Sequence, residues 1–361
     1  MKPEISVIMS VYNGETYLKE AIDSIINQTF QNWELIIIND CSTDSTGEIL
    51  AGFALMDERI KIHTNETNLK LPSSLNKAIS LCSGKYIARM DADDICLPER
   101  LEKQYKFMEE NNDIALSSCR FMTVKNGVYM SGGAGGRCDN EAIRTMLLVA
   151  NPILHPGVIA KAEVMKKFCY DTTLTCTEDL ELWTRMATED QKMQILPECL
   201  FIYRLHDKQI TSTTLERQHT EVLKIQNKYY ESCLRKMDEQ MQEFYIDGIY
   251  FTGKADTRKF IEYAKWLKSA AGKKFDKNAI NYALFEVLAE YKRHGISKAD
   301  VIRAMLTFNP FFLAKEMSRR KSAAKKDIAK CMKVAEDLGL KQTSGTKEFP
   351  VFEKQISGDN I

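Results

Sequence analysis

The amino-acid sequence predicts an open α/β domain with a mainly parallel sheet, followed by a helical C-terminal region. Over the first 125 residues, short apolar runs typical of strands alternate with segments whose apolar residues recur at helical spacing. The run from Trp33 to Ile38 is almost continuously apolar, which is typical of a parallel strand buried on both faces. Beyond about residue 215 the spacing is helical to roughly residue 340. We therefore expect one domain over residues 1–215 and a helical region over residues 216–361.

The strands and helices of the first domain can be placed in order along the chain. The expected strands cover residues 5–11, 33–38, 60–63 and 85–90, and the helices that follow them begin near residues 18, 46, 71 and 101. Asn126-Gly127 separates two further apolar runs and is typical of a hairpin turn. Thr177 precedes Glu178 and Asp179 as an N-cap precedes the acidic first turn of a helix.

The composition narrows the class of protein. Apolar residues at 44% and charged residues at 28% are ordinary values for a soluble globular chain. The formal net charge of +0 gives no reason to expect a nucleic-acid partner. The 10 cysteines include no C-x-x-C pair, and the start of the sequence does not resemble a signal peptide, so we expect a cytoplasmic protein with reduced thiols. No apolar run reaches the roughly 18 residues that a membrane-spanning helix needs.

Polar residues stand at the carboxyl ends of the expected strands. Asn13 follows the first strand, Asp40 the second, and Asp91 and Asp93 the fourth. Ligands of open α/β sheets bind beyond the carboxyl ends of the strands. We therefore expect these four side chains to lie along one rim of the sheet and to face a ligand there.

The segment Asp91-Ala92-Asp93 is a candidate metal site. Mg²⁺ and Mn²⁺ take oxygen ligands, commonly one or two carboxylates together with phosphate oxygens of a substrate. At the end of a strand the chain turns, so both carboxylates can flank one ion. The alternative is a solvated acidic loop, but the position directly after an apolar strand favours the metal site.

Asp40 has two interpretations that the sequence leaves open. Its carboxylate could accept a hydrogen bond from an N–H group on the edge of a uracil, thymine or guanine base. An adenine nucleotide fits this interpretation less well. Alternatively, it could cap the helix that follows. Spacing alone favours neither interpretation.

Two further pairs of residues have a functional and a structural interpretation. Glu178 and Asp179 could complement the dipole of their helix, or one of them could be a general base. Arg204 and His206 end another apolar strand and could hold a pyrophosphate. A histidine in such a position is more often satisfied by local contacts.

Taken together, four stretches resemble glycosyltransferase family 2, whose members have the nucleotide-sugar-binding GT-A fold. They are residues 6–46, 74–101, 155–161 and 177–186, which include DADD, HPG and TEDLELW and follow the order of the family. The resemblance covers about residues 4–210. It departs at Asn68-Leu69-Lys70-Leu71, where many members have glycine in place of Lys70.

The resemblance implies roles for individual residues. The nucleotide pocket is lined by Val11, Tyr12, Asn13 and Glu15, with Asp40 on the base. Asp91 approaches the ribose or the metal, and Asp93 is the main ligand of Mn²⁺ or Mg²⁺.

The resemblance also implies a reaction centre. Asp179 is the catalytic base, Glu178 supports it, and His155 lies close by. Arg204 and His206 match a segment that often closes over the diphosphate.

The expected function is therefore an inverting, metal-dependent transfer of a sugar from a nucleoside-diphosphate sugar, UDP before GDP or dTDP, to an acceptor hydroxyl. The acceptor would be a saccharide or a lipid-linked glycan, and the product a cell-surface or capsular polysaccharide. Two alternatives remain at this point. A nucleotidyltransferase acting on sugar phosphates would also use acids at strand ends, and a non-catalytic protein could keep the nucleotide-sugar pocket.

Aromatic and basic residues of the C-terminal region suggest a peripheral position at the inner face of a membrane. These residues are Phe308, Phe311, Phe312, Arg319, Arg320, Lys321, Lys325 and Lys326. Aromatics that pack onto the domain and leave a solvated basic helix are an equally good explanation.

Overall fold

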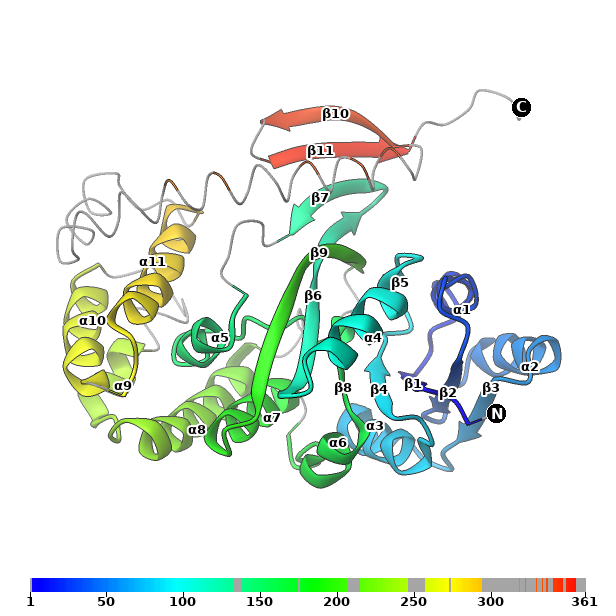
Figure 1. The fold of residues 1–361 in the computed structure, drawn as a ribbon, viewed down its shortest axis with the longest axis horizontal. Helices are drawn as coiled ribbons and strands as arrows, with labels where there is room; N and C mark the ends of the chain where they lie inside the picture. Colours follow the sequence, from blue (N-terminus) through cyan, green and yellow to red (C-terminus); the bar gives the residue numbers. More distant parts are fainter. Residues whose placement is uncertain are drawn as a thin grey trace.

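The structure is a computed structural model that describes residues 2–132, 138–174, 176–206, 215–245, 257–272, 274–293, 340–346 and 349–354, with five isolated residues between 318 and 336. The described part contains a curled β-sheet with helices packed around it, and a group of further helices lies at one side (Figure 1). This confirms the expected α/β class. No helix among these residues is both long enough and apolar enough to cross a membrane.

Four parallel strands form the N-terminal half of the sheet. β1 (Ile5–Val11) lies between β2 (Trp33–Asn39) and β4 (Tyr86–Arg89), and β3 (Ile60–Thr64) pairs with β2. All seven residues of β2 are buried, which agrees with its continuous apolar run. The carboxyl ends of these strands meet at one rim, because parallel strands run in the same direction.

Helices connect the parallel strands and cover both faces of this half. They are α1 (Leu18–Ile26), α2 (Thr46–Met56), α3 (Lys70–Leu81) and α4 (Arg100–Glu110). The apolar positions of α1 recur three and four residues apart, and Leu18, Ala21, Ile22 and Ile25 are accordingly buried.

The sheet continues beyond β4 with strands of mixed direction. β8 (Ile159–Lys161) is antiparallel to β4, β6 (Ile114–Lys125) pairs with β8, and β9 (Lys192–Arg204) runs parallel to β6. The short β5 (Ile95–Cys96) pairs with β9.

β6 and β7 (Val128–Gly132) form the hairpin that Asn126-Gly127 predicts. Asn126 and Gly127 have φ angles of 50° and 77°, the positive values that this tight turn requires.

The remaining helices occupy the other side of the molecule. α5 (Asn140–Met146), the 3₁₀ turn η1 (His155–Gly157), α6 (Ala162–Phe168) and α7 (Glu178–Thr188) belong to the α/β part. The helical region begins with α8 (Leu215–Cys233) and continues through α9 (Glu239–Tyr245), α10 (Thr257–Ala271) and α11 (Lys277–Arg293).

The helical region packs directly onto the α/β part. On α8, Gln226 donates to the carbonyl of Leu147 and the hydroxyl of Tyr230 donates to the carbonyl of Leu148. Side chains of α8, α10 and α11 share one apolar core with those of α5 and α7. The two parts are therefore joined by a continuous hydrophobic contact.

A strand hairpin follows the helical pattern, which the sequence predicts only to about residue 340, and the sequence analysis did not predict this hairpin. β10 (Leu340–Thr346) and β11 (Phe349–Lys354) are antiparallel, and β11 pairs with β7 (Figure 1). An unpaired strand edge offers a row of backbone hydrogen-bonding groups to any returning segment, and periodicity in the sequence does not reveal such a distant pairing. The aromatic and basic residues expected to face a membrane lie outside the described residues.

Candidate active site

The loops that follow β1 and β2 bind each other at the rim of the sheet. The backbone N–H of Asn13 donates to Ser42 Oγ at 3.0 Å, and Asn13 Oδ1 accepts from the N–H of Thr43 at 2.8 Å. Glu15 is held in the same way, because Glu15 Oε2 accepts from the N–H of Ser45 at 3.1 Å. These contacts order the rim and leave Asn13 and Glu15 themselves exposed.

Among the residues expected to line the nucleotide pocket, Tyr12 is an exposed aromatic residue. Its side chain is 52% exposed at the end of β1, whereas Val11 is buried within the strand. Tyr12 thus places an aromatic ring at the rim, where a flat base could stack on it.

Asp40 lies at the end of β2 and holds the start of α3. Its Oδ1 accepts from Asn65 Nδ2 and from the N–H of Leu69, both at 2.8 Å, and its Oδ2 accepts from the N–H of Lys70 at 2.9 Å. The carboxylate is 3% exposed. Asp40 therefore caps a helix, but α3 instead of the helix that follows it directly, and Oδ2 keeps capacity for a further donor.

Lys70 adopts the backbone conformation that glycine would supply at this position. Its φ angle is 70°, in the left-handed region that side chains other than Asn and Asp rarely adopt. Among the described residues, six non-glycine residues have positive φ, and Asn13, Cys41 and Lys70 follow β1, β2 and β3 in turn. Backbone strain of this kind gathers at functional sites.

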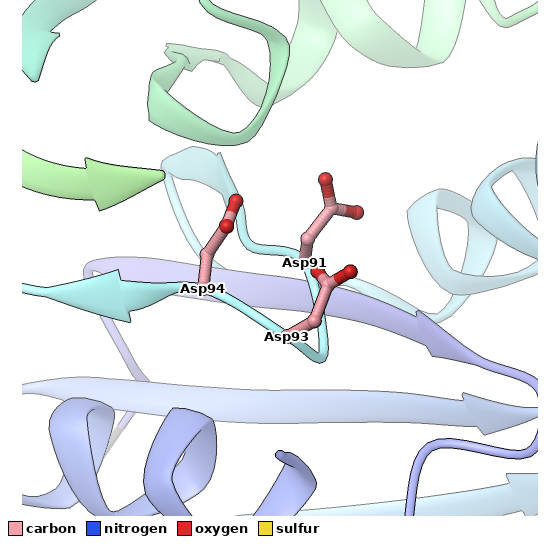
Figure 2. Close-up of side chains that lie close together, drawn as sticks. All are labelled: Asp91, Asp93 and Asp94. Carbon is pink, nitrogen blue, oxygen red and sulfur yellow. The ribbon is translucent and has the colours of Figure 1, made fainter. Parts of the chain in front are cut away.

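Three carboxylates gather on the loop that follows β4. One ligand oxygen from each of Asp91, Asp93 and Asp94 lies within 4.8 Å of the other two. Figure 2 shows that the three side chains leave the same short loop on one side. The sequence predicted Asp91 and Asp93; Asp94 was missed, although it is the next residue in DADD.

The acidic cluster fits a hard divalent cation. Asp94 is fully buried, and its Oδ2 has no hydrogen-bond partner among the described residues. Burial, together with the charges of Asp91 and Asp93, raises the pKa of Asp94 well above its usual range. A cation would satisfy the unpartnered oxygen and relieve the repulsion, and carboxylate oxygens are ligands that suit Mg²⁺ and Mn²⁺.

Arg204, the last residue of β9, and His206, two residues later, both contact this cluster. His206 Nε2 lies 2.8 Å from Asp93 Oδ2, and the backbone N–H of Arg204 donates to Asp94 Oδ1 at 2.8 Å. The guanidinium of Arg204 donates to the carbonyl of Asp93 at 2.7 Å and lies over the ring of Tyr17. The structure thus brings Arg204 and His206 to the acids that would hold the metal.

Asp179 lies in the first turn of α7. Its Oδ2 accepts from Asn151 Nδ2 and its Oδ1 from the N–H of Leu180, each at 2.7 Å. Burial raises the pKa of Asp179, which makes its carboxylate a stronger base. The charge of Asp179 contributes to the raised pKa of Asp91, so the two acids are close enough to interact.

Glu178 is buried beside Asp179 and faces His155. Glu178 Oε1 lies 3.8 Å from His155 Nδ1, and Glu178 Oε2 has no hydrogen-bond partner among the described residues. Burial and the charge of Asp179 raise the pKa of Glu178 to about 7. His155 Nε2 lies 2.8 Å from the hydroxyl of Tyr170, and burial lowers the pKa of His155 well below its usual range, so the imidazole is neutral.

Three supporting residues were missed by the sequence analysis. Arg89 pairs with Asp91, Asn151 holds Asp179, and Tyr170 contacts His155. Only Arg89 had a detectable signal, because an arginine within an apolar strand directly before an acidic loop must find a buried partner.

Comparison with known proteins identifies the family of the chain. The sequence model of the family described as Glycosyl transferase family 2 matches residues 6–158. An uncharacterised glycosyltransferase of Methanocaldococcus jannaschii is 34% identical over 253 residues, which cover 69% of this chain and 84% of the relative. The O-antigen biosynthesis glycosyltransferase WbnJ of Escherichia coli is 35% identical over 58% of this chain and 83% of its own length.

A solved structure has the same fold at low identity. TarS residues 1–349 of S. aureus, in complex with UDP-GlcNAc, superpose with a TM-score of 0.55 over 81% of this chain and 90% of that chain, at 18% identity. At that identity the likeness concerns the fold alone.

Proposed function

This chain belongs to glycosyltransferase family 2 and has the GT-A fold, and on that basis we propose that it moves a sugar from a UDP-sugar to an acceptor hydroxyl with inversion of the anomeric carbon. The observation that carries the proposal is the placement of Asp91, Asp93 and Asp94 after β4, with Asp179 close enough for its charge to act on Asp91. The acidic cluster suits a diphosphate with its cation, and a base nearby suits an incoming hydroxyl.

The donor would bind along the rim formed by the ends of β1, β2 and β4. Tyr12 offers a ring for stacking on the base, and Asp40 Oδ2 keeps acceptor capacity for the N3–H of uracil. The S. aureus protein with the same fold is described in complex with UDP-GlcNAc, which supports a uridine nucleotide. Adenine offers only its amino group on that edge and would fit less well.

The metal would be held by Asp93, with Asp91 and Asp94 beside it. When bound, a divalent cation supplies charge that stabilises a departing diphosphate. His206 holds Asp93, and Arg204 holds Asp94 through its backbone, so both residues would orient the carboxylates toward the ion.

Asp179 would remove the proton from the acceptor hydroxyl. Its raised pKa suits this task near neutral pH, and Asn151 and the N–H of Leu180 fix the orientation of its carboxylate. If Asp179 acts as the base and no carboxylate acts as a nucleophile, the acceptor hydroxyl displaces the diphosphate in a single step. The configuration of the anomeric carbon then inverts. Glu178, with the neutral His155 beside it, would support Asp179 in this role.

The product would be a cell-surface polysaccharide. The Escherichia coli relative is named for O-antigen biosynthesis, and its matched region covers 83% of its length. A saccharide or a lipid-linked glycan is the acceptor that fits such a pathway, and a peripheral membrane position remains part of this proposal.

A product assay tests the proposal directly. The full chain is incubated with a panel of UDP-, GDP- and dTDP-sugars and Mn²⁺, and the released nucleotide is identified by chromatography. Release of UDP, increased by a suitable glycan acceptor, is the expected result, and NMR of the product reports the anomeric configuration. A second incubation with UTP and a sugar 1-phosphate tests the first alternative, because pyrophosphate released there together with a new UDP-sugar would identify a nucleotidyltransferase. Stabilisation by a nucleotide sugar without any turnover would identify a non-catalytic binding protein.

A further inference from the structure

Three buried polar side chains, Tyr170, His155 and Glu178, form a row beside the proposed base Asp179. The hydroxyl of Tyr170, which follows α6, lies 2.8 Å from His155 Nε2. The other ring nitrogen, His155 Nδ1, lies 3.8 Å from Glu178 Oε1. None of the three residues is more than 8% exposed. The imidazole of His155 therefore stands between a phenol and the carboxyl group that adjoins the proposed base.

Tyr170 is held in place through its backbone. Asn76 Oδ1 on α3 accepts from the N–H of Tyr170 at 2.8 Å, and Asn76 Nδ2 donates to the carbonyl of Tyr170 at 2.9 Å, across 94 positions of the sequence. The ring of Tyr170 lies 5.4 Å from that of His155, and the ring of Trp183 packs on the imidazole at 5.9 Å with the two planes 81° apart. Packing on these two rings holds the imidazole in place, so the remaining choice is which of its nitrogens carries the proton.

The two tautomers of the neutral imidazole differ in how well they satisfy these neighbours. With the proton on Nε2, the hydroxyl hydrogen of Tyr170 would have no partner among the described residues, and the lone pair of Nδ1 would face the Glu178 carboxyl. With the proton on Nδ1, the hydroxyl donates to Nε2, and the N–H of Nδ1 is directed at Glu178 Oε1. At 3.8 Å this second contact is longer than a hydrogen bond and acts through charge. A buried donor without a partner is costly, so the structure favours the proton on Nδ1.

The tautomer of His155 affects how much negative charge Glu178 carries. The other charges that act on Glu178 come from Arg89 on β4, Asp91 on the loop after β4 and Asp179 on α7. Glu178 Oε2 has no hydrogen-bond partner among the described residues, so the group that faces Oε1 matters for the charge of this carboxyl. An N–H at Nδ1 favours the carboxylate, whereas a bare lone pair there favours the carboxylic acid.

We propose that Tyr170 is a positioning residue for sugar transfer, which donates to His155 Nε2 and so keeps the N–H of Nδ1 directed at Glu178. The inference rests on the proposed transferase function. A carboxylate at Glu178 makes proton uptake by Asp179 more favourable, because a like charge disfavours the ionised form of its neighbour. Without the phenol hydroxyl, the imidazole proton can move to Nε2, and Glu178 then takes a proton from solvent and donates it to the lone pair of Nδ1. Asp179 is the weaker base in that arrangement.

NMR spectroscopy of the full chain with ¹⁵N-labelled histidine reports the tautomer directly. Long-range ¹⁵N–¹H correlations distinguish a protonated ring nitrogen from a bare one, and the signals of His155 are those that disappear in His155→Gln. We expect a bare Nε2 in the wild type and a protonated Nε2 in Tyr170→Phe. Tyr86→Phe, which removes another hydroxyl that donates to a single partner, is the control and should leave the signals of His155 unchanged. A bare Nδ1 in the wild type, or the same tautomer in Tyr170→Phe as in the wild type, would overturn the proposal.

Transfer kinetics separate this positioning role from a general loss of stability. Tyr170→Phe should lower kcat about ten-fold and leave the KM of the UDP-sugar nearly unchanged, because the base is affected and the donor site is not. In a Glu178→Gln background, which has no carboxylate to control, the same substitution should lower kcat no further. An equal fall of kcat in both backgrounds, or a change in KM alone, would contradict the proposal. Absence of transfer by the wild type would refute the transferase function, whereas the tautomer of His155 is measured without turnover.

Discussion

The guanidinium of Arg89 holds both carboxylate oxygens of Asp91. Arg89 Nη1 donates to Asp91 Oδ2 at 2.6 Å, and Nη2 contacts Oδ1. Arg89 is 3% exposed, and its charge also opposes the raised pKa values of Glu178 and Asp179. One buried cation therefore stabilises the charged forms of Asp91, Glu178 and Asp179, which explains how these carboxylates can lie near one another.

Arg89→Met should lower the free energy of unfolding by about 3 kcal/mol, because it leaves Asp91 without its buried counter-charge. Urea unfolding measures the change. Adding Asp91→Asn to this variant should recover part of the loss, since the unpaired charge is then removed. Additive losses in the double variant would show that the ion pair contributes nothing.

Asp93→Ala should abolish the dependence of UDP affinity on Mn²⁺. The reason is its place in the acidic cluster, where it carries the ligand oxygen oriented by His206. Calorimetric titration of UDP with and without Mn²⁺ measures this dependence. Asp113→Ala, which removes a surface ion pair with Lys192, is the control and should behave as the wild type. A wild type that binds UDP equally in both conditions would refute the metal role.

Asp179→Asn should reduce sugar transfer about 10²–10⁴-fold while UDP affinity stays nearly constant, because the amide keeps the shape of the side chain but cannot take a proton. Initial rates at saturating donor and acceptor measure the loss. Asp190→Asn, two residues beyond the C-terminal end of the same helix, should keep wild-type activity. Retention of full transfer by the Asp179 variant would assign the base elsewhere.

Glu178→Gln should flatten the pH dependence of stability between about pH 4.5 and pH 7. Burial raises the pKa of Glu178 to about 7 from 4.5, so the folded protein holds this proton where the unfolded chain releases it. The free energy of unfolding therefore falls as pH rises across that window, by up to the order of 3 kcal/mol.

Thermal unfolding at a series of pH values checks this expectation. The glutamine variant should lose less stability than the wild type over the window, whereas Glu163→Gln on the exposed face of α6 should keep the wild-type slope. Parallel curves for the wild type and the Glu178 variant would show that this carboxyl does not titrate there.

Lys70→Gly should raise the free energy of unfolding by roughly 0.5–1 kcal/mol, because glycine adopts a φ of 70° without the steric cost that lysine bears. Lys70→Val should lower it, because a branched side chain is least tolerated in this conformation. Chemical denaturation compares the three proteins. Destabilisation by glycine would show that the lysine side chain contributes more than its strained backbone costs.

Local patterns in the sequence were enough to predict the α/β class and the polar rim at the carboxyl ends of the parallel strands. Apolar runs gave the four parallel strands, and the direction shared by parallel strands implied that Asn13, Asp40 and Asp91 would meet at one edge. The hairpin at Asn126 followed from turn chemistry, which depends on two adjacent residues. Each of these predictions rests on interactions between neighbours in the sequence.

Contacts between distant residues were decided only by the tertiary structure. His206 meets Asp93 across 113 positions, and Asp40 binds the backbone of Lys70 across 30. The pairing of β11 with β7 is of the same kind. A side chain or a strand edge in the sequence shows what it can bind but not which distant partner reaches it, because that choice depends on how all the layers pack at once.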